Sequence, residues 1–289
     1  MLQQQYKDNI NTLLQKIQEA EAIVVGGAAG MSAACGYNWY SSNDESFIKH
    51  FGNFIEKYGI DNMFNGFYYR FSTREERWAY MATLNKFVYD SEVGQTYLDL
   101  AKLLENKDYF IVTTNQDTQF SKVFPKDKVS AIQGDWRYFQ CNNRCHDQVY
   151  FNKEQVDEMY ENIDGTRIPT ELIPICPKCG GDMEPWVRSF VFLEGSLYKS
   201  ELSKYREYLM ENKDKKILFL ELGVGTMTPM FIKEPFWKMT HSFPSAYYIS
   251  INPNDAVVPR ELEGKGLAIT EDISKIFQDS LKDRAKNEQ

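Results

Sequence analysis

The sequence has little histidine, proline or cysteine, and it lacks any long hydrophobic run. Its 289 residues include 3 His, 10 Pro and 5 Cys, and no segment approaches the roughly 18 consecutive apolar residues of a membrane span. The first 25 residues show no charged-then-apolar signal pattern. Acidic residues (41) outnumber basic ones (33), which argues against a nucleic-acid partner. We therefore expect a cytoplasmic protein that binds neither membrane nor nucleic acid.

The hydrophobic pattern predicts an α/β fold built on a parallel sheet. Hydrophobic residues make up 43% of the chain, a globular composition. Near-continuous apolar segments alternate with stretches of helical spacing, as in parallel sheets that are covered on both faces. The expected strands are AIVVGG, YFIVT, VSAIQG, KKILFLEL, AYYISI and GLAIT, and the expected helices cover about residues 8–21, 95–104, 200–212 and the stretch from 273 onward.

Two stretches interrupt this alternation, and they predict a smaller second domain. Residues 41–90 are rich in aromatic residues at helical spacing, which predicts a helical module whose aromatic residues mostly form its own core. Residues 137–188 hold four of the five cysteines and show little buried periodicity. The main domain would then comprise residues 1–40, 91–136 and 189–289.

The four clustered cysteines predict a structural zinc site. Cys141 and Cys145 form one pair, and Cys176 and Cys179 in CPKCGG form a second pair 30 residues later. Two such pairs can close a tetrahedron around Zn²⁺, and an all-sulfur set leaves no position open for a catalytic water. His146 is an alternative ligand beside Cys145. We expect one Zn²⁺ that holds the module together without taking part in chemistry.

Small and polar residues follow the predicted strands. In an open α/β sheet, ligands bind beyond the carboxyl ends of the strands, and a small-residue loop at a helix start lets backbone amides approach phosphate. Each segment alone could be an ordinary turn or helix cap. The expected ligand-binding residues are Gly27, Ala28, Ala29, Gly30 and Ser32 after the first strand, Thr114 and Asn115 after the second, Gly223, Gly225 and Thr226 after the fourth, Asn252 after the fifth, and Asp272 and Ile273 after the last.

The order of these features resembles the sirtuins, NAD-consuming enzymes with a Rossmann-like domain, a four-cysteine zinc module and a helical module. Residues 28–32 (AAGMS) stand where that family has Gly-Ala-Gly-x-Ser, and residues 114–117 (TNQD) overlie its Gln-Asn-Ile-Asp. Residues 223–225 (GVG) match its Gly-Thr-Ser, and residues 251–252 (IN) match its Ile-Asn. The resemblance implies that NAD is a co-substrate bound by these loops.

Two departures from the sirtuin pattern change the expected chemistry. The family's Pro-Asp-Phe-Arg is replaced by residues 38–41 (NWYS), and its catalytic His-Gly is replaced by Gln133-Gly134. A neutral amide cannot serve as the general base that deacylation requires. The Gln133 replacement resembles the macrodomain-linked class M sirtuins, which implies a protein mono-ADP-ribosyltransferase acting on a lipoylated glycine-cleavage H-like carrier, with a macrodomain protein that reverses the modification.

The catalytic residues implied by this resemblance are Asn115, Asp117 and Gln133. Asp117 would orient or activate the acceptor, Asn115 would hold the ribose and a water, and Gln133 would hydrogen-bond the ribose hydroxyls. The aromatic stretch offers an apolar channel for a lipoyl-like arm, besides its role as core. Two other functions stay open: an NAD glycohydrolase, and a catalytically inactive sensor of NAD or ADP-ribose.

Overall fold

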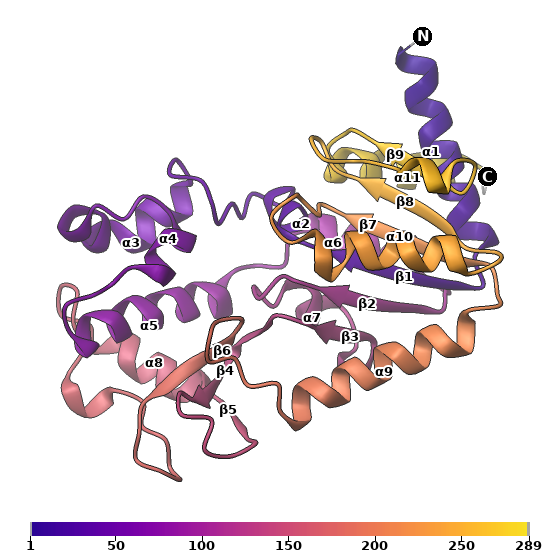
Figure 1. The fold of residues 1–289 in the computed structure, drawn as a ribbon. Helices are drawn as coiled ribbons and strands as arrows, with labels where there is room; N and C mark the ends of the chain where they lie inside the picture. Colours follow the sequence, from indigo (N-terminus) through magenta and orange to yellow (C-terminus); the bar gives the residue numbers. More distant parts are fainter. Residues whose placement is uncertain (1, 288–289) are drawn as a thin grey trace.

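The computed structural model describes residues 2–287 and contains a six-stranded sheet and a three-stranded sheet, each with its own helices (Figure 1). The order of the larger sheet is β3-β2-β1-β7-β8-β9, and every neighbouring pair is parallel. Its strands are β1 (Ala22–Gly27), β2 (Tyr109–Thr113), β3 (Val129–Ala131), β7 (Ile217–Leu222), β8 (Tyr247–Ile251) and β9 (Gly266–Ile269).

Alternating side chains of these strands fill two separate cores, one on each face of the larger sheet. Ile23 and Val25 of β1 point into a core with helices on one face, whereas Ala22 and Val24 point into the core on the other face. The first face is covered by α1 (Leu2–Glu19), α6 (Gln95–Leu103), α7 (Gln119–Val123) and α11 (Ile273–Asn287). The second face is covered by α9 (Ser196–Asn212) and α10 (Lys233–Ser242).

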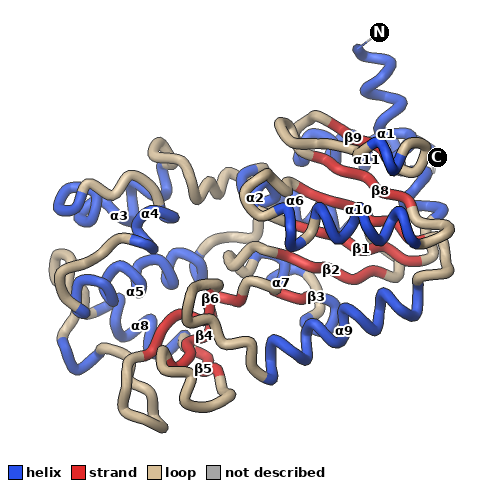
Figure 2. Tube along the Cα trace, in the orientation of Figure 1, coloured by secondary structure: helices blue, strands red, loops and turns tan. Residues whose placement is uncertain are grey.

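The three-stranded antiparallel sheet belongs to the smaller domain, at the left of Figures 1 and 2. Its strands are β4 (Gly134–Cys141), β5 (Val149–Phe151) and β6 (Met183–Val187), and its helices are α3 (Glu45–Tyr58), α4 (Met63–Tyr68), α5 (Arg74–Asp90) and α8 (Lys153–Glu161). Their buried side chains form a third core, so the helical module and the cysteine-bearing module fold together around one set of apolar residues.

The remaining elements are short. They are α2 (Ala29–Ala33) and the 3₁₀ turns η1 (Lys126–Lys128), η2 (Thr170–Leu172), η3 (Pro229–Phe231) and η4 (Arg260–Leu262). Within residues 2–287, no helix is both long and apolar enough to cross a membrane.

The predicted fold class is confirmed, a parallel α/β sheet with a smaller cysteine-bearing domain. The cysteine-bearing segment shows little buried periodicity in its sequence, yet Phe139 and Trp186 on β4 and β6 are almost fully buried. Pairing with strands distant in sequence buries these residues, and such pairing leaves a weak local pattern. His241 lies in the last turn of α10, a helix that the sequence pattern did not predict.

Candidate active site and metal centre

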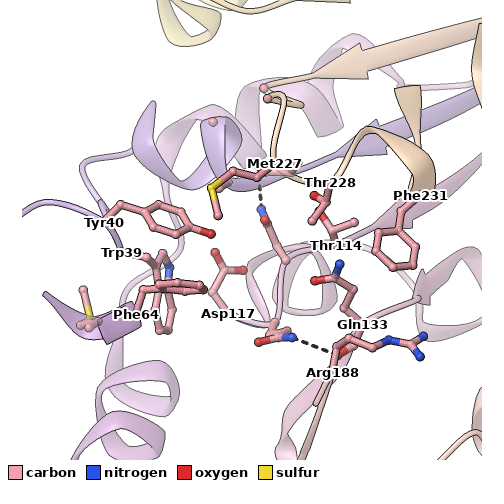
Figure 3. Close-up of a pocket in the computed structure, with 18 of the residues that line it drawn as sticks. Trp39, Tyr40, Phe64, Thr114, Asp117, Gln133, Arg188, Met227, Thr228 and Phe231 are labelled. Atoms are coloured by element: carbon pink, nitrogen blue, oxygen red, sulfur yellow. Dashed lines mark hydrogen bonds between the residues drawn. The ribbon is translucent and has the colours of Figure 1, made fainter. Parts of the chain in front are cut away.

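A cavity of about 550 Å³ lies between the carboxyl edge of the larger sheet and the helices of the smaller domain (Figure 3). The loops after β1, β2, β7 and β8 line one side of it. The strand order reverses between β1 and β7, because the chain adds β2 and β3 on one side of β1 and β8 and β9 on the other side of β7. Open α/β sheets bind their ligands at such a reversal point.

The cavity has two chemically different walls. The polar wall comprises Thr114, Asn115, Gln116, Asp117 and Gln133, from the loops after β2 and β3. The aromatic wall comprises Trp39, Tyr40, Phe64, Phe67, Tyr68 and Trp136. Figure 3 shows Trp39, Tyr40 and Phe64 gathered on one side of Asp117, with Thr114 and Gln133 on the other side.

Asn115 donates hydrogen bonds to acceptors from several segments. Its backbone N–H donates to Thr113 Oγ1 at 2.9 Å, and its Nδ2 donates to the Ala28 carbonyl at 2.9 Å. Nδ2 also lies 3.1 Å from Ser32 Oγ and 3.3 Å from Tyr97 Oη. Because its contacts come from β2, the loop after β1 and α6, the amide has a fixed place at the cavity.

Asp117 is a buried carboxylate supported by neutral donors. Ser32 Oγ donates to its Oδ2, and the backbone N–H of Gln119 donates to its Oδ1 at 3.2 Å. Burial raises the pKa of the Asp117 carboxyl, and the hydrogen bonds from Ser32 and Gln119 counteract part of that rise. The next residue, Thr118, has a φ of 64°, a conformation that non-glycine residues rarely adopt. This sharp turn starts α7 directly beyond the carboxylate.

Gln133 is anchored through its backbone, which leaves its side chain at the cavity. Its carbonyl accepts from Gln116 Nε2 at 3.0 Å and from the Arg188 N–H at 2.8 Å. Gly134 follows with a φ of 88°, and a Cβ at that position would lie 2.0 Å from the Trp186 carbonyl oxygen. Glycine is therefore required where the chain crosses into the smaller domain.

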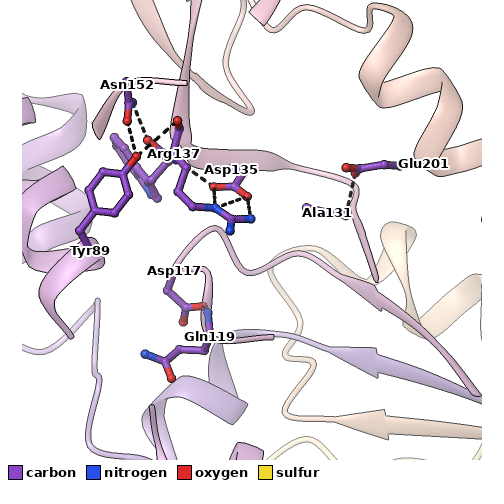
Figure 4. Close-up of polar contacts among 9 residues, drawn as sticks. Tyr89, Asp117, Gln119, Ala131, Asp135, Arg137, Asn152 and Glu201 are labelled. Atoms are coloured by element: carbon purple, nitrogen blue, oxygen red, sulfur yellow. Dashed lines mark hydrogen bonds and ion pairs between the residues drawn. The ribbon is translucent and has the colours of Figure 1, made fainter. Parts of the chain in front are cut away.

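Polar contacts lie on both sides of this crossing (Figure 4). The Arg137 guanidinium donates to both carboxylate oxygens of Asp135, and Tyr89 Oη donates to Asn152 Oδ1 at 2.6 Å. Glu201 on α9 accepts from the Ala131 N–H at 3.3 Å, and burial raises the pKa of its carboxyl to about 7. The Arg137–Asp135 contact lies within β4, the Tyr89–Asn152 contact joins α5 to the residue before α8, and the Glu201–Ala131 contact joins α9 to β3.

The loops after β1 and β7 touch backbone to backbone. The Gly30 N–H donates to the Gly223 carbonyl at 3.1 Å, and a Cβ on Gly30 would lie 2.5 Å from Gly223 Cα. Under the β7 loop, buried Glu221 accepts from Lys233 Nζ at 2.5 Å and from Tyr248 Oη at 2.6 Å. Burial raises the pKa of Glu221, and the Lys233 charge opposes that rise. Because residues 30 and 223 are both glycine, the backbones of these two loops can touch each other at the cavity.

Most of the residues expected from sequence line this cavity. They are Ala28, Ala29, Gly30, Thr114, Asn115, Asp117, Gln133, Gly223, Gly225, Thr226 and Asn252. The Asn252 side-chain amide is hydrogen-bonded within the protein. It donates to the Val224 carbonyl in the loop after β7 and accepts from the N–H groups of Asn254 and Asp255 in its own loop.

Four expected residues are not among the described lining residues. Gly27 makes room for the Phe120 ring under the loop, and Ser32 is fully buried behind Asp117. Asp272 is exposed and accepts from the Lys275 N–H in the first turn of α11, while Ile273 lies in the hydrophobic core. Gly27 and Ser32 thus lie behind the cavity wall, whereas Asp272 and Ile273 belong to the start of α11.

Cys141, Cys145, Cys176 and Cys179 form one cluster whose sulfur atoms all lie within 4.8 Å of one another. The Cys141–Cys179 and Cys145–Cys176 sulfur distances are 3.6 and 3.7 Å. A tetrahedron with Zn–S bonds of roughly 2.3 Å has sulfur atoms about 3.8 Å apart, so the cluster fits Zn²⁺. His146 lies beside it, with Nδ1 3.0 Å from Cys145 Sγ and Nε2 2.8 Å from Tyr150 Oη. The cysteines form a zinc site.

Solved structures of sirtuins share this fold. Sir2Tm bound to a propionylated peptide matches with a TM-score of 0.61 and 16% identity over 96% of this chain and 98% of that one. A Sir2 complex with p53 peptide and NAD+ matches with a TM-score of 0.57 and 15% identity over 96% and 98%. No family model matches the sequence.

A relative in sequence shows the activity. The chain is 36% identical over 272 residues to a protein ADP-ribosyltransferase of Staphylococcus aureus (strain Mu50 / ATCC 700699), a match that covers 92% of this chain and 85% of that protein. The chain belongs to the ADP-ribosyltransferase sirtuins. It is an NAD-dependent ADP-ribosyltransferase, with NAD as co-substrate and a four-cysteine zinc site.

A second relative of this sirtuin is a longer protein. It is named probable bifunctional ADP-ribose hydrolase/ADP-ribosyltransferase, from Fusarium oxysporum f. sp. cubense, and is 28% identical over 265 residues. The match covers 87% of this chain but 44% of the fungal protein.

No histidine lines the described cavity of this ADP-ribosyltransferase. His50 lies in α3, where its Nδ1 contacts the Ser46 carbonyl, and His146 lies beside the cysteine cluster. His241 lies at the end of α10. The polar groups of the described lining residues therefore include amides, hydroxyls, carboxylates and the Arg188 guanidinium, but no imidazole.

Arg188, Asp255 and Tyr97 are among the site residues that the sequence interpretation missed. Arg188 and Asp255 line the cavity, and Tyr97 contacts Asn115 from behind. Arg188 Cζ lies 4.2 Å from the centre of the Phe192 ring, and its Nη1 donates to Glu194 at 2.7 Å. The apolar residues Trp186 and Val187, directly before Arg188, were the local signal that a strand ends there.

Proposed function

We propose that this sirtuin transfers a single ADP-ribose from NAD to a lipoylated glycine-cleavage H-like carrier, with little or no deacylase activity. The observation that carries the proposal is the pairing of the two cavity walls: amides and a carboxylate without imidazole on one side, and aromatic rings on the other. The first wall suits cleavage of a glycosidic bond, and the second suits an apolar arm.

The polar wall supplies the groups that ribosyl transfer needs. The bond between the ribose anomeric carbon and the nicotinamide nitrogen breaks, and its electron pair leaves with neutral nicotinamide. The cation-like ribose is stabilised by fixed oxygen dipoles and negative charge, the role we assign to Asn115 and Asp117. The acceptor attacks the anomeric carbon and gives up its proton, with Asp117 oriented to receive it. Gln133 hydrogen-bonds the ribose hydroxyls.

The small-residue loops suit the rest of the dinucleotide. Ala28, Ala29 and Gly30 line the cavity at the start of α2, where their small side chains leave room for the pyrophosphate beside the backbone. Gly223, Gly225 and Thr226 lie opposite, and Asn252 shapes the next loop. We assign these residues to the binding of the ADP-ribose portion.

The aromatic wall suits an apolar acceptor arm. Tyr40 and Tyr68 are 46% and 56% exposed although both line the cavity, so ring surface is available at its mouth. Phe64 packs against both, with ring centres 5.0 and 5.1 Å away. A lipoyl group on a flexible lysine arm is long and largely apolar, and burying it against these rings gives favourable contact area.

The proposal includes a partner and a location. The fungal relative's name joins an ADP-ribose hydrolase to an ADP-ribosyltransferase in one protein, which supports a macrodomain partner that reverses the modification here. The five cysteines, all within the described residues, form no disulfide, as is typical of proteins in the reducing cytoplasm.

One assay tests the proposal. NAD labelled in its adenosine portion is incubated with the enzyme and either the lipoylated carrier or the unmodified carrier, and nicotinamide release and protein-bound label are both measured. We expect label on the lipoylated carrier alone. Nicotinamide release with no label on any protein would assign an NAD glycohydrolase, and NAD binding with no release would assign a sensor; either result overturns the proposal.

A further inference from the structure

Tyr97 on α6 is fully buried, yet its hydroxyl reaches the polar residues behind the cavity. Tyr97 Oη lies 3.2 Å from Ser32 Oγ and 3.3 Å from Asn115 Nδ2. The ring packs edge-on against Phe120, with centres 4.8 Å apart. Tyr97 itself does not line the described cavity. Its effect on the cavity must therefore pass through Ser32 and Asn115.

The direction of each hydrogen bond follows from the number of protons available. Ser32 has one hydroxyl proton and donates it to Asp117, so its oxygen can only accept from its other neighbours. The Tyr97 hydroxyl must therefore donate to Ser32 and accept from the Asn115 amide. Burial, with the nearby Asp117 charge, raises the pKa of Tyr97 well above its ordinary value, so that proton stays in place.

The same contacts fix which end of the Asn115 amide faces the cavity. Three oxygen atoms surround the inward end of the amide, namely the Ala28 carbonyl, Ser32 Oγ and Tyr97 Oη. A flipped amide would place its carbonyl oxygen against the Ala28 carbonyl oxygen, with no proton between them. The nitrogen must point inward and the Oδ1 acceptor must point into the cavity, toward a ribose hydroxyl or a water.

We propose that Tyr97 is a positioning residue of this enzyme, which holds the Asn115 amide with its oxygen toward the NAD ribose and keeps Ser32 donating to Asp117. This inference rests on the proposed role of Asn115 in the transfer. Tyr97 touches neither NAD nor acceptor in this scheme. Its hydroxyl contacts Asn115 directly and reaches Asp117 through Ser32. The Asn115 amide and the Asp117 carboxylate should therefore both lose their alignment when the hydroxyl is removed.

The test compares Tyr97→Phe with Tyr208→Phe. Tyr208 is a buried tyrosine of the same domain whose hydroxyl contacts the Ile23 carbonyl at 3.5 Å, away from the cavity. We expect Tyr97→Phe to lower kcat for nicotinamide release by at least about tenfold, with the KM for NAD unchanged within about twofold, because alignment is lost but the binding loops are intact. Tyr208→Phe should keep the wild-type kcat.

A Ser32→Ala background separates alignment from general structure. If Tyr97 acts through Ser32 and Asn115, Tyr97→Phe should cost much less in the Ser32→Ala background than in the wild type. Fully additive losses would overturn the proposal, as would a kcat within about twofold of wild type, or a fall in the unfolding temperature of more than about 5 °C in Tyr97→Phe. A wild-type enzyme that releases no nicotinamide would instead contradict the proposed function.

Discussion

The two walls of the cavity differ in how firmly the fold holds them. The polar wall follows β2 and β3 of the parallel sheet, and Asn115 and Asp117 are fixed by hydrogen bonds to buried partners. The aromatic wall stands mainly on α4 and on the segment before α3, with Trp136 from β4, and Tyr40 and Tyr68 are about half exposed. Groups that stabilise a transition state need fixed geometry, whereas a surface that receives a protein arm can adapt. The contrast assigns chemistry to one wall and acceptor recognition to the other.

The largest effect should come from the polar wall, with Asn115→Ala. Removing the amide takes away a fixed dipole at the anomeric carbon, and we expect nicotinamide release and transfer to fall by about 10³-fold. Both are measured with labelled NAD, together with zinc content, which should be unchanged. Asn162→Ala, at an exposed position at the end of α8, is the matched control. Wild-type transfer in Asn115→Ala would show that the catalytic wall is wrongly assigned.

Zinc removal tests whether the aromatic wall depends on the metal centre. Trp136 of that wall lies on β4, the strand that ends at Cys141. Loss of Zn²⁺ through Cys176→Ser should destabilise the core that β4 shares with α3 and α5, and we expect transfer to the carrier to fall by about 100-fold.

The fifth cysteine offers the control for the zinc experiment. Cys35 lies outside the cluster, so Cys35→Ser should retain one zinc per chain and an unfolding temperature close to that of the wild type. Metal analysis and thermal unfolding measure both. Full transfer by a zinc-free Cys176→Ser enzyme would mean that the aromatic wall needs no support from the metal centre.

A smaller effect should come from the aromatic wall, with Tyr40→Ala. Because Tyr40 offers exposed ring surface at the cavity mouth, its loss should raise the KM for the lipoylated carrier by about tenfold, the equivalent of roughly 1.4 kcal/mol. Nicotinamide release without carrier should not change. Tyr160→Ala, at an exposed tyrosine on α8, controls for loss of surface aromatic area. Equal losses with and without carrier would remove the distinction between the walls.

The polar wall was largely predictable from sequence because parallel strands align their carboxyl ends. Thr114, Asn115 and Gly223 follow central strands, and they meet at the cavity as expected. Asp272 and Ile273 also follow a strand, β9, which is one of the two edge strands. The other edge strand, β3, leads Gln133 to the cavity, whereas β9 leads within a few residues into α11. Those two residues therefore serve the start of α11 and the core.

The residues that escaped prediction depend on contacts between distant segments. Tyr97 has ordinary helical spacing in its own segment, and its role follows only from the approach of Ser32 and Asn115. Arg188 directly follows β6, a strand that forms by pairing with β4 across about 50 residues of sequence. The aromatic stretch was predicted to offer an apolar channel, and Phe64, Phe67 and Tyr68 of the wall lie in it, but Trp39, Tyr40 and Trp136 lie outside it. Which aromatic residues form the core and which face the cavity depends on the packing of α3, α4 and α5.

The smallest effect should come from Gln133→His, which restores the family's histidine within the polar wall. The imidazole would stand near Arg188, whose guanidinium donates to the carbonyl of the preceding residue, Ile132, at 2.9 Å, and a nearby cation disfavours the protonated imidazole. The Arg of the Pro-Asp-Phe-Arg segment would still be missing at residues 38–41. We expect deacylation of an acetyl-lysine peptide to rise by less than about threefold, since one base without its aligned partners contributes little. Robust turnover, measured as peptide deacetylation per NAD consumed, would show that the imidazole alone separates deacylase from transferase in this cavity.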